Sequence, residues 1–583
     1  MLRNLIKYTV LVTVVGLTAC EKRLVVTNPN SGETKRVLGT PLDAENLLGT
    51  YYRRWHGGLY GTGNPPTTFE GMANIMSLMN YSSLANNCQN SRAPFTGATN
   101  SNAPGNVCAG EQANVYFTMG EVDRVASNFL LQMADSGLTI GTTAPATDAR
   151  NLRAQAFAEF LRGLSLGYLA TFYDSAAVIS PKMSMAPEDC VPDPFTAVCV
   201  GRLRGYKQVA DSSMAAFQRA IDYANAPTTG SGGFPLPGSW IASPTSYTAP
   251  EFIKFVRTYR ARVRASIART AAERAAVNWA SVIADAQNGI TADNLTTTSI
   301  TDGIGAGWRR VYDGGTTWHQ MPPFIIGMAD NSGSYAAWIA QPVSERGSGN
   351  VSFFMTTPDL RFPQGATRAA QQADFAITSC QAAKTTCKRY FANRQTADQF
   401  SGLGFGWSNY DFQRFHSWVL AGDAGTARNG DLTFFTKAEL DMLQAEGLYR
   451  TGDFAGAAAL VNVTRVRNGL PAITAFDATT PVPGGANCVP KVPVGPTFNT
   501  VACGNLFEAL KYEKRIETAF THFAPWFTDM RGWGDLPAET ALFWAVPYQD
   551  LQARGTAISA LYGAGIGSGN APASFAAKGT YGW

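Results

Sequence analysis

One short motif has the spacing of a catalytic nucleophile. Residues 163–167 read Gly-Leu-Ser-Leu-Gly, the Gly-x-Ser-x-Gly pattern in which Ser165 would attack a carbonyl carbon. That chemistry requires a strand before the serine and a sharp turn at the serine itself. Here the motif lies within a stretch of strong helical periodicity. We therefore interpret its small residues as sites of close helix packing.

Other signs of enzyme chemistry are weaker. The glycine-rich run 402–407 lacks the spacing of a dinucleotide-binding loop, and no His-Glu-x-x-His motif occurs. Paired carboxylates could hydrolyse a glycosidic bond, but a chain with 43 acidic residues singles out no pair. The charge pattern near the C-terminus favours internal salt bridges over chemistry. The residues concerned are Glu513, Glu517, Asp529 and Arg531.

The eight cysteines that follow Cys20 form four pairs that are close in sequence. The pairs are Cys88 with Cys108, Cys190 with Cys199, Cys380 with Cys387, and Cys488 with Cys503. Eight cysteines allow on the order of a hundred connectivities, but the large gaps between the pairs make neighbour pairing the simplest. Each bond would staple a surface loop, and disulfides require an oxidising compartment. A metal site is disfavoured because no Cys-x-x-Cys motif occurs and the four histidines lie far from the pairs.

Aromatic residues gather in a middle region rich in Gly, Ser and Asn. A sugar ring has an apolar C–H face and a hydroxyl edge, so aromatic platforms beside amide or charged side chains suit it. The candidate ligand-binding residues of this region are Trp308, Trp318, Tyr335, Trp338 and Trp407. A second candidate wall near Cys88 consists of Tyr81, Asn86, Asn87 and Arg92. The competing interpretation is that such residues fill gaps between irregular segments.

Helices account for the segments of clear periodicity and must position these loops. Apolar residues recur at every fourth position in 151–173, which predicts a helix with one apolar stripe. Further helices are expected at 250–267 and 278–289. A capping box at 436–439 begins another helix, and a Thr-Gly-Asp turn joins it to a second that ends near Gly469. These two resemble a tetratricopeptide-type hairpin, although no strict period of about 34 residues recurs.

The composition fits an exported and folded chain. Its 583 residues are 45% hydrophobic and only 15% charged, and the 57 glycines and 31 prolines predict long ordered loops on a large core. Arg3 and Lys7 precede an apolar run at 8–17 that is too short to span a bilayer and is typical of a secretion signal. Without these two basic residues the formal charge of +4 falls to about +2, and so small a net charge does not indicate nucleic-acid binding. We expect the arginines between positions 257 and 274 to form the solvated face of a helix.

Two sets of motifs resemble those of a known family. Leu17-Thr18-Ala19-Cys20 resembles a bacterial lipobox, which implies cleavage before Cys20 and its lipidation with palmitate-like acyl chains. Near the C-terminus the chain reads NLFEALKYEKRIETAF at 505–520, WFTDMRGWGDL at 526–536 and AVPYQDL at 545–551. In order and spacing these resemble the SusD/RagB family of outer-membrane nutrient-binding lipoproteins. Segments 150–157 and 440–470 resemble the family's scaffold helices, and 359–362 resembles its short Asp-Pro-Arg element.

The resemblance implies a mainly α-helical, irregular tetratricopeptide-like scaffold with a long loop-rich ligand-binding face (SusD-like). The regions expected along the chain are a lipoprotein signal peptide at 1–19, a lipidated tether at 20–40, a SusD-like helical region at 41–290, a variable loop-rich binding region at 291–430 and a C-terminal region at 431–583.

By the same resemblance the protein would face the exterior of the cell, held to the outer membrane by its lipid alone. It would bind a glycan or similar nutrient and act with a SusC-like TonB-dependent outer-membrane transporter. No catalytic residue, cofactor or nucleic-acid partner is expected. A structural calcium ion stays open, because oxygen ligands from scattered loops leave no readable spacing. The alternatives from other classes are an exported polysaccharide hydrolase and a surface lipoprotein with an adhesive or structural role.

Overall fold

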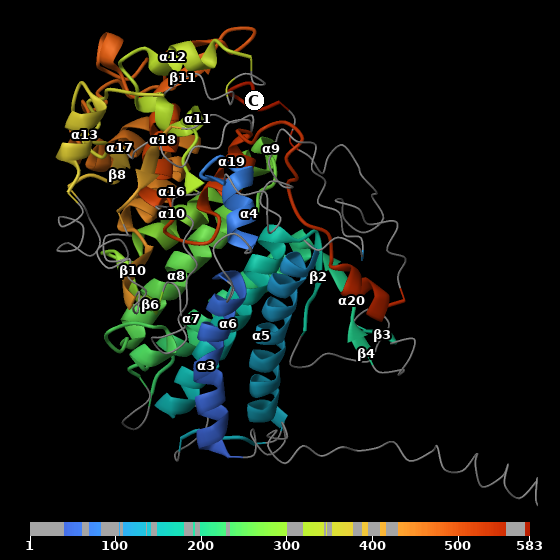
Figure 1. The fold of residues 1–583 in the computed structure, drawn as a ribbon. Helices are drawn as coiled ribbons and strands as arrows, with labels where there is room; N and C mark the ends of the chain where they lie inside the picture. Colours follow the sequence, from blue (N-terminus) through green and yellow to red (C-terminus); the bar gives the residue numbers. More distant parts are fainter. Residues whose placement is uncertain are drawn as a thin grey trace, which may run out of the picture.

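Helix α6 (Ala149–Phe172) runs through the middle of a mainly helical protein (Figure 1). The computed structural model describes residues 40–60, 69–82, 104, 109–135, 137–141, 148–179, 190–192, 199–228, 234–299, 319–342, 346, 353–376, 388–393, 408–414, 429–555, 576 and 578–583. Asp148 begins α6 by accepting hydrogen bonds from the backbone N–H groups of Arg150 and Asn151 at 2.9 and 3.3 Å. The helix confirms the predicted one at 151–173.

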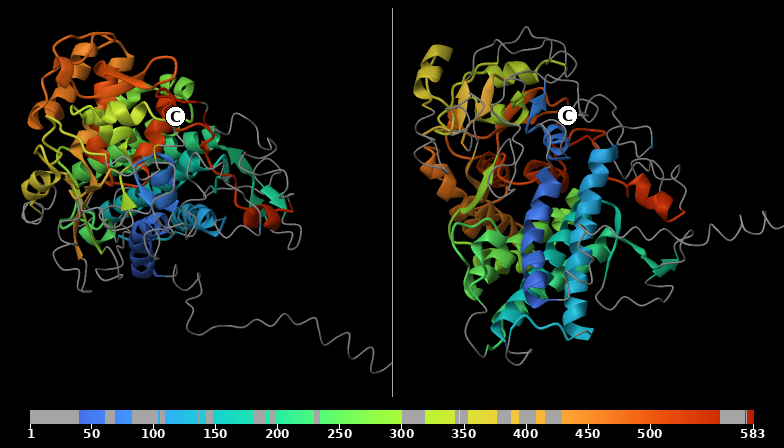
Figure 2. Two further views of the ribbon diagram at one scale, coloured as in Figure 1. Left: turned by 45° about the horizontal axis from the view of Figure 1, so that its top comes forward. Right: turned by 60° about the horizontal axis from the view of Figure 1, so that its bottom comes forward.

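Nearly all residues of α6 are buried because other helices surround it. It contacts α3 (Pro41–Tyr60), α5 (Ala109–Asp135), α7 (Tyr206–Asn225) and α8 (Ala249–Ser266). Helices α3 and α5 also contact each other, and Figure 2 shows them side by side. A large apolar core that includes aromatic rings from all five helices fills the space between them.

Two glycines allow α6 to approach its neighbours closely. A Cβ atom at Gly163 would lie 2.7 Å from the ring of Phe217 on α7. A Cβ atom at Gly167 would lie 2.7 Å from a methyl group of Val263 on α8. Ser165 is buried between them and donates its hydroxyl to a backbone carbonyl one turn earlier at 2.7 Å. The Gly-x-Ser-x-Gly motif therefore serves helix packing, as the periodicity predicts.

A second group of helices forms around the predicted hairpin. Helix α16 (Lys437–Arg450) and helix α17 (Phe454–Arg467) are joined by a tight turn in which Gly452 has a φ of +90°. Both helices contact α18 (Leu506–Thr518), and α16 also contacts α10 (Trp279–Gln287). The hairpin and the helix expected at 278–289 are confirmed.

The capping box predicted at 436–439 is only half formed. The hydroxyl of Thr436 accepts a hydrogen bond from the backbone N–H of Glu439 at 3.1 Å, as expected. The carboxylate of Glu439 does not accept the second hydrogen bond of the box, from the backbone N–H of Thr436, because the guanidinium of Arg262 binds both its oxygens at 2.7 Å. A complete box stands instead at the start of α8, between Thr248 and Glu251.

The arginines between positions 257 and 274 correct another expectation, since they are not all a solvated face. Arg260, Arg262 and Arg274 are buried and paired with carboxylates. Arg274 binds Glu446 of α16 at 2.6 Å and Asp529 of the C-terminal region at 3.1 Å. Arg262 and Arg274 join α8 and α9 (Ala271–Ala275) to α16, far along the chain, whereas Arg260 binds Asp285 of the nearby α10.

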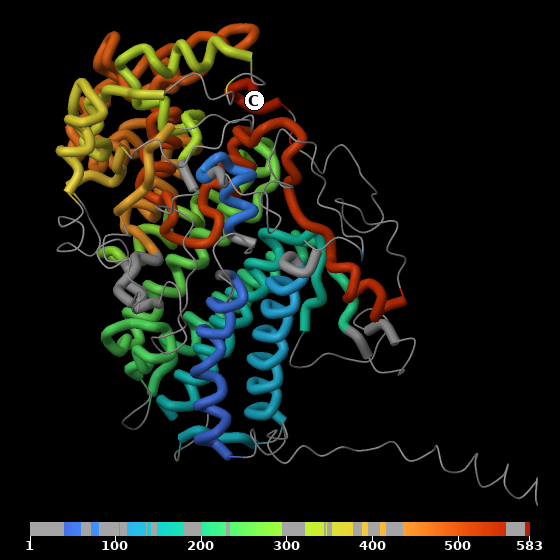
Figure 3. Tube along the Cα trace, viewed as in Figure 1, coloured from blue at the N-terminus to red at the C-terminus, as the bar shows by residue number. Residues whose placement is uncertain are grey.

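Short helices and the C-terminal segment complete the fold. The short helices are α4 (Phe69–Met76), α9 (Ala271–Ala275), α11 (Pro323–Ile326), α12 (Ser334–Ile339), α13 (Arg368–Asp374), α19 (Pro525–Trp533) and α20 (Tyr548–Ala553). After α19 the chain runs in Figure 3 to the right-hand side of the view, and Figure 1 shows α20 there beside strands that follow α6. Trp544 joins the two regions: its N–H donates to the carbonyl of Phe172 and its carbonyl accepts from Asp174.

The described strands are short and pair antiparallel, two by two. The pairs are β1 (Tyr81–Ser82) with β7 (His319–Gln320), β2 (Ser175–Ala177) with β5 (Leu203–Gly205), β3 (Cys190–Pro192) with β4 (Cys199–Gly201), β6 (Asn294–Ser299) with β10 (Asn429–Phe435), β8 (Phe391–Asn393) with β9 (Tyr410–Phe412), and β11 (Lys491–Val494) with β12 (Thr500–Cys503). These short strand pairs are additions to a mainly helical scaffold. Within the described ranges, no helix has both the length and the apolar character needed to cross a membrane.

Candidate functional site

Two of the predicted ligand-binding residues are core residues in this structure. Tyr335 and Trp338 are each 1% exposed, and their rings stack on each other with centroids 6.1 Å apart. The Tyr335 hydroxyl donates to the backbone carbonyl of Phe324 at 2.7 Å, and the Phe324 ring packs against Trp338. Because this segment turns inward as helix α12, its aromatic residues form no exposed platform. For these two residues the prediction is wrong.

The other predicted ligand-binding residues are not described. Asn86, Asn87, Arg92, Trp308, Trp318 and Trp407 lie outside the described residues, as does the lipidation site Cys20. Tyr81 is described only through its backbone, which pairs with Gln320 between β1 and β7. Ligand binding by these residues, and lipidation of Cys20, remain predictions.

One of the four expected disulfides is present in the described part of the chain. Cys488 and Cys503 are bonded and close a loop before α18. The backbones of Cys190 and Cys199 lie on the paired strands β3 and β4, where Pro192 faces Cys199. Cys88, Cys108, Cys380 and Cys387 lie outside the described residues. The remaining three bonds stay predictions.

The C-terminal charges are structural, as predicted, and all but Arg531 form the internal salt bridges expected of them. Glu513 and Glu517 are wholly buried and bind Arg361, while Asp529 binds Lys514 at 2.7 Å. Arg531 instead donates to three backbone carbonyl oxygens, those of residues 171, 266 and 542, at 2.6–2.9 Å. None of these groups is exposed to a ligand. In the described part of the chain, no cluster of three or more His, Cys, Asp or Glu residues is arranged to hold a metal ion.

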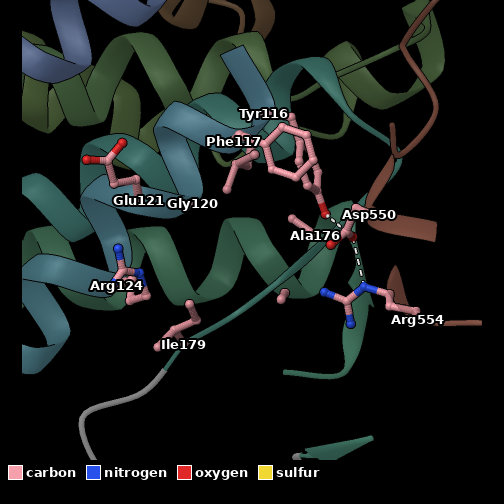
Figure 4. A pocket seen from close by; sticks show the side chains of 11 residues that line it. Tyr116, Phe117, Gly120, Glu121, Arg124, Ala176, Ile179, Asp550 and Arg554 are labelled. Atoms are coloured by element: carbon pink, nitrogen blue, oxygen red, sulfur yellow. Dashed lines mark hydrogen bonds and ion pairs between the residues drawn. The ribbon is translucent and has the colours of Figure 1, made fainter. Parts of the chain in front are cut away.

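A cleft of about 400 Å³ opens where α5, β2 and α20 meet (Figure 4). Its volume is within the range of small-ligand pockets, roughly 300–1,000 Å³. One face of α5 forms a wall of the cleft, because residues three, four and seven positions apart share a helix face. The α5 residues of this wall are Tyr116, Phe117, Gly120, Glu121 and Arg124.

The apolar part of the cleft centres on Phe117. This side chain is 43% exposed, which is unusual for an aromatic residue of a core-packed helix. The side chains of Leu169, Ala176 and Ile179 add aliphatic surface. Gly120 leaves the backbone of α5 open to the cleft, since a Cβ atom there would meet no atom within 4 Å.

Hydrogen-bonding groups stand beside this apolar surface. Arg124 is exposed and lines the cleft, and it makes no hydrogen bond or ion pair with any described residue. Glu121 is held in place by the guanidinium of Arg54 at 2.8 Å and by the hydroxyl of Tyr51 at 3.4 Å. Burial and the neighbouring Glu121 raise the pKa of Tyr51, so its phenol stays protonated and donates.

The far end of the cleft is fixed by α20. Asp550 accepts hydrogen bonds from the Tyr116 hydroxyl at 3.3 Å and from Nε of Arg554 at 2.8 Å. Burial, reinforced by the Asp550 carboxylate, raises the pKa of Tyr116 well above its ordinary value. Arg554 also donates to the carbonyl of Gly201 on β4 at 2.5 Å. The cleft therefore has a rigid polar end.

Beneath the cleft, Asp123 of α5 holds the chain that leaves β2. Its carboxylate accepts hydrogen bonds from the backbone N–H of Ile179 and from Nε of Arg162, both at 3.2 Å. Burial raises the pKa of Asp123 to about 6, although the Arg162 guanidinium opposes that shift. The segment after β2, which forms the floor of the cleft, is therefore hydrogen-bonded to Asp123 of α5, and Asp123 in turn is paired with Arg162 of α6.

The cleft combines an exposed aromatic ring with charged hydrogen-bonding groups, and its carboxylates are both paired with arginines. This arrangement suits a hydroxyl-rich ligand with an apolar face. Sequence reasoning missed it, because the cleft residues come from a helix and not from loops. The available signal was the spacing of Phe117, Gly120, Glu121 and Arg124 on one helical face.

No protein-family model and no curated protein sequence matches the chain. Solved structures do match it. A SusD homolog from Parabacteroides distasonis gives a TM-score of 0.51 at 14% identity, over 88% of this chain and 93% of that one. The chain has the SusD fold. At this identity the likeness establishes the fold alone, which confirms the mainly helical, tetratricopeptide-like scaffold expected from the sequence.

Further SusD-type structures match at lower scores. A SusD superfamily protein from Bacteroides thetaiotaomicron gives a TM-score of 0.49 at 12% identity, over 88% of this chain and 96% of that chain. A SusD-like protein described as laminarin binding gives a TM-score of 0.43 at 13% identity, over 87% of this chain and 97% of that chain.

Proposed function

We propose that the protein is a cell-surface lipoprotein that binds an oligosaccharide nutrient and passes it to a TonB-dependent outer-membrane transporter. The observation that carries the proposal is the SusD fold, which is shared over 88% of the chain. The lipobox at Cys20 supports attachment to the outer membrane through lipid. The protein would bind its ligand and release it unchanged.

The cleft supplies the chemistry for a sugar. Phe117 offers an exposed ring for the C–H face of a pyranose, and Arg124 and Glu121 stand one to two helical turns further along to meet its hydroxyl edge. Because Glu121 is already held by Arg54, its free lone pairs have a fixed direction. A shallow site of this kind suits transient capture, since the ligand must leave again.

The test is a titration of the purified, detergent-solubilised lipidated protein with neutral oligosaccharides of α-glucan, β-glucan, mannan, xylan and chitin. We expect at least one class to bind, and Phe117→Ala to weaken that binding tenfold or more, because the variant loses both the apolar area that the ring buries against the sugar and a specific ring contact, which in aromatic pairs contributes about 0.5–1.5 kcal/mol beyond area burial. The matched control is Phe476→Ala, which removes a ring that is 53% exposed on another surface. Its affinity should stay at the wild-type value.

Three results would contradict parts of this proposal. Binding of none of the glycans would overturn the choice of ligand. Glycan binding that Phe117→Ala leaves intact would keep the function and move the site elsewhere. Release of reducing ends during incubation would show a hydrolase.

A further inference from the structure

A second cavity, of about 410 Å³, lies between α7, the end of α8 and α9. It shares no residue with the Phe117 cleft. Much of its wall is aliphatic and comes from Ala210, Met214, Ile267, Ala268 and Val277. Such a surface favours an aliphatic ligand group over water.

Arg264 lines this cavity and lacks a close carboxylate. Its nearest carboxylate among the described residues is Asp285, with Nη2 and Oδ2 4.0 Å apart. Asp285 is already bound by Arg260, through Nε at 2.8 Å and Nη2 at 2.5 Å, and by Arg257 at 3.2 Å. One carboxylate therefore serves three guanidinium groups.

The Nε atom of Arg264 is buried and has no hydrogen-bond partner in the described part of the chain. Burial lowers the pKa of Arg264, and the neighbouring Asp285 carboxylate opposes that shift only in part. A guanidinium that is partly buried and incompletely paired is a strong site for a carboxylate, because it can bind both oxygens at once.

The rest of the cavity limits the charge and shape of a ligand. Lys207 is 71% exposed and lies 3.5 Å from Glu273, a weak pair that leaves the ammonium free to move. Glu273 is held by the Tyr206 hydroxyl and by the backbone N–H of Arg269. Together with Asp211 at the rim, it disfavours ligands with several negative charges.

The aromatic ring in this cavity is already covered. The guanidinium of Arg269 lies 3.6 Å from the centre of the Tyr206 ring, and the Lys207 ammonium lies 5.7 Å from it. A sugar would find no open platform here, in contrast to the Phe117 cleft. The site therefore differs in chemistry from the proposed glycan site.

We propose that this cavity binds a small monocarboxylate with an aliphatic body. The carboxylate pairs with the Arg264 guanidinium, and the aliphatic body packs on Met214, Ile267 and Val277. The site is independent of glycan binding and would give the protein a second ligand.

The test is a titration of the full lipidated protein with sodium hexanoate, with 1-hexanol as the uncharged probe. Hexanoate should bind at least tenfold more tightly than 1-hexanol. Arg264→Gln should lower hexanoate affinity at least tenfold. Arg257→Gln is the matched control, because it removes another arginine from the same Asp285 cluster but does not line the cavity. Its affinity should remain within twofold of the wild type.

A second pair of variants leaves the arginine cluster intact. Met214→Glu places a negative charge in the cavity wall and should abolish hexanoate binding, whereas the neutral Met214→Gln of similar length should retain most of it. Equal binding of hexanoate and 1-hexanol, equal losses in Arg264→Gln and Arg257→Gln, or no hexanoate binding at all would overturn the proposal. Glycan affinity should not change in any of these variants.

Discussion

Arg361 and Glu513 are 152 residues apart in sequence, yet Nη1 of the arginine donates to Oε2 of the glutamate at 2.8 Å in a wholly buried site. The same guanidinium binds Asp359 at 2.8 Å and Glu517 at 3.2 Å. This group therefore fastens the segment at 359–362 to helix α18. Two of the segments that carry the family resemblance, 359–362 and 505–520, therefore meet at this point.

Removal of Arg361 should strongly destabilise the fold. Arg361→Met removes the cation that binds the buried Asp359 carboxylate and weakens the pairing of Glu513 and Glu517, a loss of about 3–5 kcal/mol in the free energy of unfolding. The control is Arg54→Met, which breaks an ion pair whose arginine side chain is 51% exposed and should cost about 0–1 kcal/mol. Urea denaturation followed by circular dichroism measures both. Equal effects would show that the buried network contributes no more than a surface pair.

Acid should weaken the fold through Glu517. Burial raises the pKa of Glu517, but Arg414, Arg361 and Arg467 outweigh that effect and lower it to about 2. Because this folded-state pKa lies below the ordinary value of 4.5, the stabilisation is present above pH 4.5 and is lost as the pH falls toward 2. Glu517→Gln should flatten the pH dependence of the unfolding free energy in this window. An unchanged slope in the variant would contradict the assignment.

The close packing of α6 gives a prediction that runs against helix propensity. Gly163→Ala should destabilise the protein by about 1–3 kcal/mol, because the new methyl group meets the Phe217 ring. Gly57→Ala in α3, where no atom lies within 4 Å of the new Cβ, should be neutral or stabilise by up to about 1 kcal/mol. Thermal unfolding of the two variants tests the difference. A stabilised Gly163→Ala protein would mean that α6 and α7 are not in close contact.

The cleft can be filled without disturbing the core. Gly120→Leu places a large side chain in the space beside Phe117, and leucine is also the better helix former, so the variant should fold normally. Its affinity for the glycan identified by titration should fall tenfold or more. Gly120→Ala adds only one methyl group and should bind nearly as the wild type does. Wild-type affinity in the leucine variant would place the glycan outside the cleft.

The scaffold was predictable from the sequence because its signals are local. Helix periodicity and caps such as Asn278, whose side chain accepts a hydrogen bond from the N–H of Ser281 at 3.0 Å, are set by neighbouring residues. Residues that pair with each other from distant parts of the sequence leave no such local pattern. From the sequence alone Arg262 is expected at the surface, because its partner Glu439 lies 177 positions later in the chain.

The candidate site was harder to predict for the same reason. Tyr116 and Asp550 meet across 434 positions, and no periodicity links them. Loop composition suggested that Tyr335 and Trp338 are exposed, whereas a backbone carbonyl inside the protein satisfies the Tyr335 hydroxyl and allows both rings to be buried. Composition describes the average environment of a segment and does not fix the direction of a single ring.

The proposed role as the nutrient-binding partner of an outer-membrane transporter requires a stable complex between the two proteins. Purification of the tagged, lipidated protein from its own outer membranes in mild detergent, with mass spectrometry of the proteins that accompany it, tests for that complex. We predict a TonB-dependent barrel in stoichiometric amount, and its loss when Cys20→Ala removes the lipid anchor. Recovery of the wild-type protein alone, under conditions that preserve other membrane complexes, would contradict the claim.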